Sequence, residues 1–224
     1  AMFCSLQEVL KNHIIYVLCV DDETHGLLSR MGWKRIRLIH ICELRNESLE
    51  QIRKKRKINE YCWTLKPLLI EAVFSRDTKI DRVTYVDADL FFFSDPSVIF
   101  RNQPNCSVLL SRGDIVIPSL EPENKKILQA LLGRYNSGFI SFRRDETGLK
   151  CLRWWKNRCL ESCVSKPEAG LFGDQKYLDD MPAISPNVCE IQTPGVNIGH
   201  WNRALYHFSV VDGKIHAGGS RLIC

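Results

Sequence analysis

The stretch Arg82-Val-Thr-Tyr-Val-Asp-Ala-Asp-Leu-Phe-Phe-Phe-Ser-Asp-Pro96 carries the clearest structural information in the chain. Its first half predicts a buried β-strand, because residues 83–86 are all β-branched or aromatic and no charge interrupts them. Two carboxylates, Asp87 and Asp89, follow at the carboxyl end of this strand, where open α/β sheets bind their ligands. Carboxylate oxygens suit Mg²⁺ and Mn²⁺, so the pair predicts a divalent-metal site.

The Asp-x-Asp spacing alone is weak evidence, because a chain of this composition contains roughly one such pair by chance. The setting adds weight. Phe91, Phe92 and Phe93 follow directly, so the carboxylates lie between two apolar runs, where an unpaired charge is costly. An Asp-rich turn that merely ends the strand, closed by Asp95-Pro96, is the alternative interpretation.

Strands and helices alternate in the first part of the chain. The expected elements are a strand at 13–20, a helix at 24–31, a strand at 35–41, a helix that begins at Asn46 or Ser48, a helix at 64–74 with Pro67 in its first turn, and the strand at 83–87. This alternation predicts an α/β fold with a mostly parallel central sheet. Residues 2–4 fit poorly as an additional first strand, because their connection to His13 is shorter than the ~10–12 residues of a crossover.

The second half predicts shorter elements around one strong helix. They are a strand at 107–110, a helix at 123–132, a turn at 135–138 that feeds a strand at 139–142, a helix at 148–163, a short helix after Phe172, and short strands at 186–199 and 210–223. No internal repeat or low-complexity linker divides the chain. We therefore expect one domain with a substantial core.

The composition, 45% apolar and 25% charged, is that of an ordinary globular protein. No apolar run approaches the ~20 residues needed to span a bilayer. The ten cysteines contain no Cys-x-x-Cys, and several lie in apolar runs, so reduced thiols and a cytoplasmic location are expected. Cys159 and Cys163, four residues apart on a predicted helix, could form half of a metal site, but no second half is visible.

Five consecutive basic residues, Arg53 to Lys57, contribute much of the net charge of +5. A solvated helix end is the simplest interpretation, and phosphate-bearing substrates or peripheral contact with an anionic membrane are the alternatives. Nucleic acid is not an expected partner, because the sequence shows neither a basic face with stacking aromatics nor a known binding module.

Four segments, taken in order, carry a family resemblance. They are Glu60-Tyr-Cys-Trp-Thr-Leu-Lys-Pro67, Val83-Thr-Tyr-Val-Asp-Ala-Asp-Leu90, Tyr135-Asn-Ser-Gly-Phe-Ile140 and Gly173-Asp-Gln175. Together they resemble the GT-A class of nucleotide-diphospho-sugar glycosyltransferases, in particular glycosyltransferase family 8, the glycogenin and lipopolysaccharide galactosyltransferase type. The resemblance implies a single GT-A domain over residues 1–224 with a small additional β region. Residues 1–100 would bind the nucleotide, and residues 101–224 would bind the sugar and the acceptor.

The resemblance also implies a metal and diphosphate site. Asp87 would bind the ribose or the metal, and Asp89 would ligate a metal, Mn²⁺ or Mg²⁺, that bridges the two phosphates. Lys66 would offset phosphate charge, although a surface lysine is the ordinary alternative. A histidine usually completes the metal shell in the family. His200 is the candidate here, and His207 is the second choice.

The sugar site implied by the resemblance comes from the other two motifs. Asn136 and the backbone of Ser137 and Gly138 would hydrogen-bond the sugar. Asp174 would bind sugar hydroxyls, and Gln175 would lie near the anomeric carbon, opposite the leaving group. Without the resemblance, a plain turn would explain the first motif, and a helix N-cap would explain Asp174.

The function implied by the resemblance is metal-dependent transfer of a sugar, with retention, from a nucleotide sugar such as a UDP-sugar to a glycan, lipid-linked or protein acceptor. Two alternatives stay open. A phosphatase of the haloacid-dehalogenase type would use Asp87 as its nucleophile and the later carboxylates of Asp174, Asp179 and Asp180 for Mg²⁺, but that family has Thr or Val where Phe91 stands. A GT-A-like domain that binds a nucleotide sugar without turnover is the other alternative.

Overall fold

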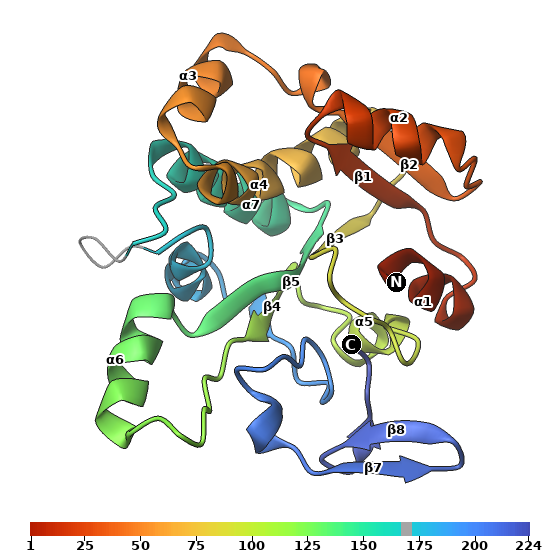
Figure 1. Ribbon diagram of the computed structural model, residues 1–224, viewed down its shortest axis with the longest axis vertical. Helices are drawn as coiled ribbons and strands as arrows, with labels where there is room; N and C mark the ends of the chain where they lie inside the picture. Colours follow the sequence, from red (N-terminus) through yellow and green to blue (C-terminus); the bar gives the residue numbers. More distant parts are fainter. Residues whose placement is uncertain (167–171) are drawn as a thin grey trace.

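The computed structural model describes residues 1–166 and 172–224 (Figure 1). In this part of the chain the strands form a two-stranded sheet, a four-stranded sheet and a three-stranded sheet, with helices packed around them. The predicted α/β class is therefore confirmed.

The first sheet is a short strand-helix-strand unit. Strand β1 (Ile15–Cys19) runs parallel to β2 (Ile36–His40), and α2 (Asp22–Arg30) connects them. The Asp21 side chain caps α2 by accepting a hydrogen bond from the backbone N–H of Thr24. The unit was predicted from the sequence, and both strands end toward the same edge of the sheet.

The central sheet has the order β3-β5-β4-β6, formed by β3 (Arg82–Val86), β5 (Tyr135–Arg143), β4 (Val108–Arg112) and β6 (Val188–Glu190). The long strand β5 is antiparallel to both of its neighbours, whereas β4 and β6 are parallel. The sheets are thus mixed, and the expected mostly parallel arrangement is wrong in this respect. Alternation of strands and helices fixes the fold class but not where a later strand inserts.

Helices α4 (Ile58–Arg76) and α7 (Glu146–Glu161) lie side by side against this sheet (Figure 1). In the core between them, the indole of Trp155 stacks on Phe142 with ring centroids 5.8 Å apart. Helix α4 begins earlier than predicted, so Pro67 lies in its interior and not in its first turn. Proline has no N–H, so the helix lacks one i→i−4 hydrogen bond at this point.

The remaining elements complete the periphery. They are the helices α1 (Met2–Val9), α3 (Glu47–Lys55), α5 (Ser97–Asn102) and α6 (Pro122–Leu132), the 3₁₀ segments η1 (Ile41–Glu43), η2 (Lys176–Ala183) and η3 (Arg203–Leu205), and the strands β7 (Phe208–Val211), β8 (Lys214–Ala217) and β9 (Ser220–Arg221). Residues 2–4 are therefore helical, which removes the conflict with a short crossover. The predicted turn at Asp212-Gly213 joins β7 and β8.

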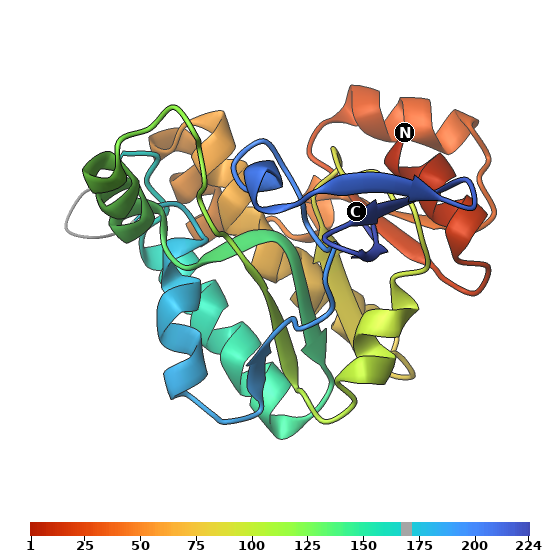
Figure 2. The same ribbon diagram turned by 90° about the horizontal axis from the view of Figure 1, so that it is seen from below.

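The segment that follows the two carboxylates is held from both ends of the chain, which lie near each other in both ribbon views (Figures 1 and 2). The backbone N–H of Phe92 donates to the Ser5 hydroxyl at 3.0 Å. The backbone N–H of Phe93 donates to the carbonyl of Ile223 at 2.8 Å, and the hydroxyl of Ser94 donates to that of Leu222 at 2.6 Å. These contacts fix the backbone just after Asp89.

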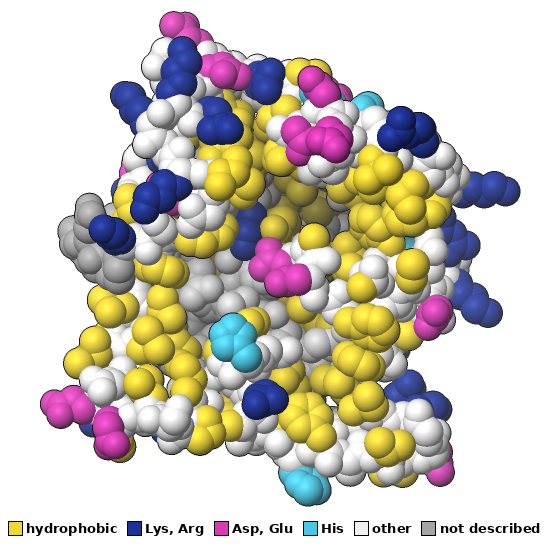
Figure 3. Space-filling model, in the orientation of Figure 1, with side chains coloured by type: hydrophobic (Ala, Val, Ile, Leu, Met, Phe, Trp, Pro, Cys, Tyr) yellow, Lys and Arg dark blue, Asp and Glu magenta, His cyan; other side chains and the backbone are white. Residues whose placement is uncertain are grey.

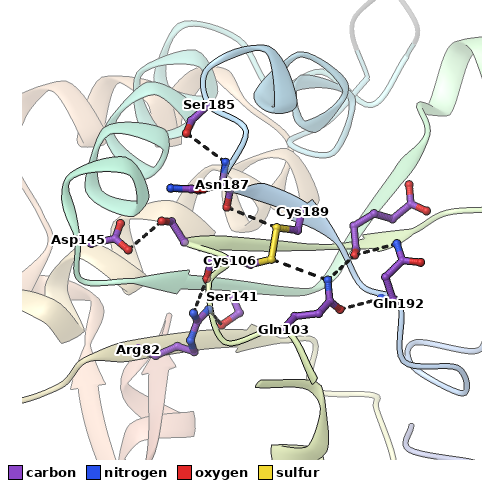
Figure 4. Close-up of a disulfide and its surroundings, with 11 residues drawn as sticks. Arg82, Gln103, Cys106, Ser141, Asp145, Ser185, Asn187, Cys189 and Gln192 are labelled. Carbon is purple, nitrogen blue, oxygen red and sulfur yellow. Dashed lines mark hydrogen bonds between the residues drawn. A yellow bond between two sulfur atoms is a disulfide. The ribbon is translucent and has the colours of Figure 1, made fainter. Parts of the chain in front are cut away.

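A disulfide joins Cys106 and Cys189 (Figure 4). Parallel pairing of β4 with β6 places Leu109 opposite Cys189, and Cys106 precedes β4 by two residues. The two Cα atoms are 5.8 Å apart, within the usual range for a disulfide. The prediction of reduced thiols is therefore wrong for this pair, whereas the other eight cysteines are free, and the cytoplasmic location stays a prediction. Strand pairing across 83 residues was not visible in the sequence.

The basic run is only partly a solvated helix end. Arg56 turns inward and donates to the carbonyls of Cys159 at 2.6 Å and Leu160 at 2.7 Å, so it caps the last turn of α7. Lys54 and Lys55 stay exposed, and their contact with an anionic membrane remains a prediction. Within residues 1–166 and 172–224, none of the helices combines the length and the apolar character needed to cross a membrane.

Candidate functional site

Asp87 stands at the carboxyl end of β3 and is held by its neighbours. Its backbone N–H donates to the carbonyl of Gly138 on β5 at 2.9 Å. Its Oδ1 accepts a hydrogen bond from the Tyr85 hydroxyl at 2.8 Å and lies 3.2 Å from Nζ of Lys66. Burial, together with the Asp87 carboxylate, raises the pKa of Tyr85, so the phenol stays protonated and donates. The other carboxylate oxygen of Asp87, Oδ2, has no hydrogen-bond or ion-pair partner among the described residues and remains open to a ligand.

Lys66 links three of the predicted site residues. It is 6% exposed on α4, and its Nζ lies 3.2 Å from Asp87 Oδ1, 3.5 Å from Asp174 Oδ2 and 3.0 Å from the Ser137 hydroxyl. Burial lowers the pKa of Lys66, but the carboxylates of Asp174 and Asp87 outweigh burial, so the pKa lies above its usual value. Lys66 is therefore a buried cation shared by two carboxylates, and the surface-lysine alternative is wrong.

Asp174 is 3% exposed, yet its Oδ2 makes no hydrogen bond in the described structure. Gln175, not Asp174, stands at the N-cap of η2, and no side chain caps that segment. The N-cap alternative for Asp174 is therefore wrong. A buried carboxylate oxygen with unused acceptor capacity is unusual in a folded protein, because such groups normally find a donor. The long 3.5 Å ion pair of this oxygen with Nζ of Lys66 leaves it acceptor capacity for a hydroxyl group of a ligand.

The Asn-Ser-Gly motif lies inside β5 and not in a turn before it. A register shift in β4 between Leu110 and Ser111 faces this motif. The side-chain oxygen of Asn136 accepts hydrogen bonds from the backbone N–H of Gly138 at 2.7 Å and from the Asn197 side chain at 2.9 Å. The plain-turn interpretation is thus replaced by a strand irregularity held by side-chain hydrogen bonds.

Gly138 is required by close approach. A Cβ atom at this position would lie 2.8 Å from Oδ1 of Asn136 and 2.9 Å from Oδ2 of Asp87. Both distances are too short for a carbon atom and an oxygen atom without a bond between them. Because Gly138 has no side chain, the carboxylate of Asp87 can lie against β5.

These side chains surround one cavity of about 110 Å³, and a hollow is visible near the middle of the face in Figure 3. Predicted site residues make up six of the nine lining residues, which are Trp63, Lys66, Asp87, Asn136, Ser137, Phe172, Gly173, Asp174 and Gln175. Pockets for drug-sized ligands measure about 300–1,000 Å³, so this cavity would hold one polar part of such a ligand. Gln175 contributes its carbonyl end, because its Nε2 donates to the Leu132 carbonyl at 2.8 Å.

Sequence reasoning missed Asn197, Trp63 and Phe172. Asn197 is 1% exposed and adopts a φ of 55°, a conformation in which asparagine is enriched. Its position between Gly195 and Gly199 could have indicated an unusual backbone. The two aromatic rings pack 6.0 Å apart at the wall of the cavity, and nothing in their local sequence indicates that contact.

The predicted metal ligands are only partly brought together. Asp89 is exposed in the turn after β3 and has no hydrogen-bond or ion-pair partner among the described residues, so its carboxylate is free to contact solvent or a bound cation. His200 is exposed, with its ring edge-on to Trp201 at 5.2 Å, and His207 is exposed as well. Within residues 1–166 and 172–224, no three His, Cys, Asp or Glu side chains form a ready metal cluster. The third ligand therefore stays a prediction.

Comparison with known proteins agrees with this geometry. A family model described as nucleotide-diphospho-sugar transferase matches residues 10–183. The chain is 54% identical over 215 residues to the uncharacterized protein YfnF of Bacillus subtilis (strain 168), covering 96% of this chain and 71% of that protein. It is 29% identical over 227 residues to the uncharacterized protein YfnD of the same organism, covering 99% of this chain and 70% of that protein. The chain belongs to the nucleotide-diphospho-sugar transferase family.

Proposed function

We propose that the chain is a metal-dependent glycosyltransferase that moves a sugar from a nucleoside-diphosphate sugar to a hydroxyl group of a glycan, lipid-linked or protein acceptor. The observation that carries the proposal is the buried Lys66 of α4, which lies between Asp174 and Asp87, the residue that follows β3, in a chain of this family. The motif resemblance to glycosyltransferase family 8 supports three finer points: a UDP-sugar donor, Mn²⁺ or Mg²⁺ as the metal, and retention at the anomeric carbon.

The carboxylates fit a hard divalent cation. Asp87 Oδ2 and both oxygens of Asp89 have no partner in the described part of the chain, and carboxylate oxygens are the ligands that Mg²⁺ and Mn²⁺ prefer. When bound, such a cation supplies Lewis-acid stabilisation of the departing nucleoside diphosphate. His200 is proposed as a further ligand on the motif resemblance alone.

The residues of the cavity orient the sugar. Asp174 Oδ2 accepts a hydrogen bond from a sugar hydroxyl, which satisfies its unused acceptor capacity. Lys66 places its ammonium group between the two carboxylates and donates a hydrogen bond to the Ser137 hydroxyl at 3.0 Å. Gln175 presents its side-chain carbonyl to the same space, because its amide nitrogen is already bonded to the end of α6.

The phosphatase alternative has less support. Asp179 would be one of its later carboxylates, but Oδ1 of Asp179 accepts from the backbone N–H of Arg134 at 2.6 Å and Oδ2 pairs with Lys176 at 2.8 Å. Asp179 therefore ties the connection between α6 and β5 to η2 and does not line the cavity that contains Asp87. Asp174 does line that cavity, but its Oδ2 lies 3.5 Å from Nζ of Lys66. The arrangement favours binding of a sugar over attack on a phosphate monoester.

Incubation of the purified protein with Mn²⁺ and a panel of nucleotide sugars tests the proposal by the release of nucleoside diphosphate. Asp89→Asn should abolish release while the protein still folds, and Asp212→Asn, in the exposed hairpin turn, should leave the rate unchanged. Normal Mn²⁺-dependent release by Asp89→Asn would refute the metal role. Orthophosphate from phosphomonoesters would establish the phosphatase instead, and tight donor binding with neither product would establish a non-catalytic domain.

A further inference from the structure

A second constellation of reactive side chains lies where β1 and β2 end, and none of its members lines the cavity described above. His40 is the last residue of β2, Cys42 lies in η1, and Asp22 is the first residue of α2. The His40 Nδ1 is 2.8 Å from the Cys42 sulfur, and the His40 Nε2 is 2.8 Å from Oδ1 of Asp22. A thiol, an imidazole and a carboxylate are therefore connected in that order.

The hydrogen bonds determine which imidazole nitrogen carries the proton. The backbone N–H of Cys42 donates to Nδ1 of His40 at 3.3 Å, so Nδ1 is an acceptor. The proton of the neutral ring is then on Nε2, where it is donated to Asp22. The single lone pair of Nδ1 is shared between the backbone N–H of Cys42 and the Cys42 sulfur, which is closer at 2.8 Å, so Nδ1 can take the thiol proton, which is the role of the base beside an activated nucleophile.

The tight turn after β2 creates this geometry. The backbone N–H of His40 donates to Oε1 of Glu43 at 2.7 Å, and Glu43 also forms an ion pair with Arg76. The His25 ring packs edge-on against His40 with centroids 5.0 Å apart. The imidazole is therefore fixed on several sides, with its side chain 19% exposed, whereas Cys42 is open to solvent. The Asp22 side chain is 97% exposed, so its effect on the imidazole is weakened by water.

We propose that Cys42 is an activated thiol and a site of covalent modification by low-molecular-weight disulfides. His40 takes the thiol proton, and the thiolate of Cys42 attacks one sulfur of the disulfide. A new Sγ–S bond forms as the old S–S bond breaks, and the departing thiolate takes the proton from His40. The products are the mixed disulfide at Cys42 and one free thiol, so protons and electrons balance. The glycosyl transfer proposed above does not use this chemistry.

The chain contains its own reference thiol. Cys4 is also exposed and has no histidine or carboxylate partner in the described structure. A base beside a thiol takes its proton as the sulfur attacks, and Cys4 lacks such a base. Thiol-disulfide exchange at Cys42 should therefore be several-fold to tenfold faster than at Cys4.

Oxidised glutathione and iodoacetamide, applied separately to the folded protein at pH 7 and followed by peptide mass spectrometry, measure both rates. His40→Asn keeps an oxygen able to accept from the Cys42 backbone but removes the base. This variant should bring the Cys42 rate down to the Cys4 rate, and His216→Asn on β8 should change neither. Asp22→Asn should slow Cys42 by no more than a few-fold.

Equal rates at Cys42 and Cys4 in the wild-type protein would overturn the proposal. So would a Cys42 rate that is unchanged in His40→Asn. An unaltered Cys4 rate and an unaltered melting temperature show that a variant still folds, so a slower Cys42 reaction then reports the loss of the base. Neither probe depends on nucleotide sugars or metal, so failure here is distinguishable from failure of the glycosyltransferase proposal.

Discussion

Replacing Lys66 with Met removes a buried ammonium group from between two carboxylates. Its Nζ lies 3.2 Å from Asp87 Oδ1 and 3.5 Å from Asp174 Oδ2. The Asp87 side chain is 38% exposed, so water screens it after the substitution and its pair contributes little. Asp174 is 3% exposed, and an uncompensated carboxylate at such a site costs about 3–5 kcal/mol. We expect the free energy of unfolding to fall by about this amount.

Urea unfolding measures the loss. With a slope of about 2 kcal/mol per M, the midpoint should fall by about 2 M. Lys79→Met, which changes an exposed lysine, should alter the free energy by less than about 0.5 kcal/mol. Because the carboxylates hold the pKa of Lys66 above its usual 10.5, its contribution is complete below that pH and is lost only as the pH rises through the raised pKa. The difference between the wild-type protein and Lys66→Met should therefore be equal at pH 7 and pH 9.

A second substitution separates the ion pair from simple packing. Asp174→Asn in the Lys66→Met background removes the uncompensated charge, so the double variant should be more stable than Lys66→Met alone. If the two losses instead add, the cost of Lys66→Met comes from misfitted side-chain volume, and the electrostatic explanation is refuted.

Three further substitutions test other parts of the structure. Gly138→Ala places a methyl group against two oxygens and should cost about 1–3 kcal/mol and weaken donor binding measured by calorimetry, whereas Gly26→Ala, which meets no atom within 4 Å, should do neither. In the double variant Cys106→Ser and Cys189→Ser, the free energy of unfolding measured in urea should be about 2–4 kcal/mol lower than in the oxidised protein. Equal urea midpoints would show that the disulfide does not stabilise the fold. Arg56→Met leaves two carbonyls at the end of α7 without their donor and should cost about 1.5–3 kcal/mol, and an unchanged urea midpoint would contradict the capping role.

The sequence predicted best what depends on neighbouring residues. The strand that ends at Asp87 begins and ends within one residue of its predicted bounds, because residues 83–86 are all β-branched or aromatic, although the strand is half-buried and not buried as predicted. The motif resemblance selected Lys66, Asn136, Asp174 and Gln175, which the structure brings around one cavity although they are far apart in the sequence. No local sequence pattern predicts that these residues lie close together. That prediction came from the resemblance of the four motifs, taken in order, to a known family.

Features that depend on contacts distant in sequence were not predictable. β5 inserts between β3 and β4, and its direction is set by pairing with both neighbours at once. The disulfide requires the register of β4 with β6, and the inward turn of Arg56 requires the end of α7. In each case the local sequence is compatible with several partners, and tertiary packing selects one of them.

Gly138 shows how a residue without a side chain could have indicated part of this site. Three side-chain oxygens surround the position where its Cβ would be: Oδ1 of Asn136 at 2.8 Å, Oδ2 of Asp87 at 2.9 Å and Oδ1 of Asn197 at 3.4 Å. A glycine inside a strand weakens the strand, so its presence indicates close approach by another group. Sequence reasoning assigned Gly138 to a turn, where glycine needs no such explanation. Recognising it as a strand residue would have predicted a close approach at this point of β5, whereas the groups that make it, Asp87 and Asn197, follow only from the tertiary structure.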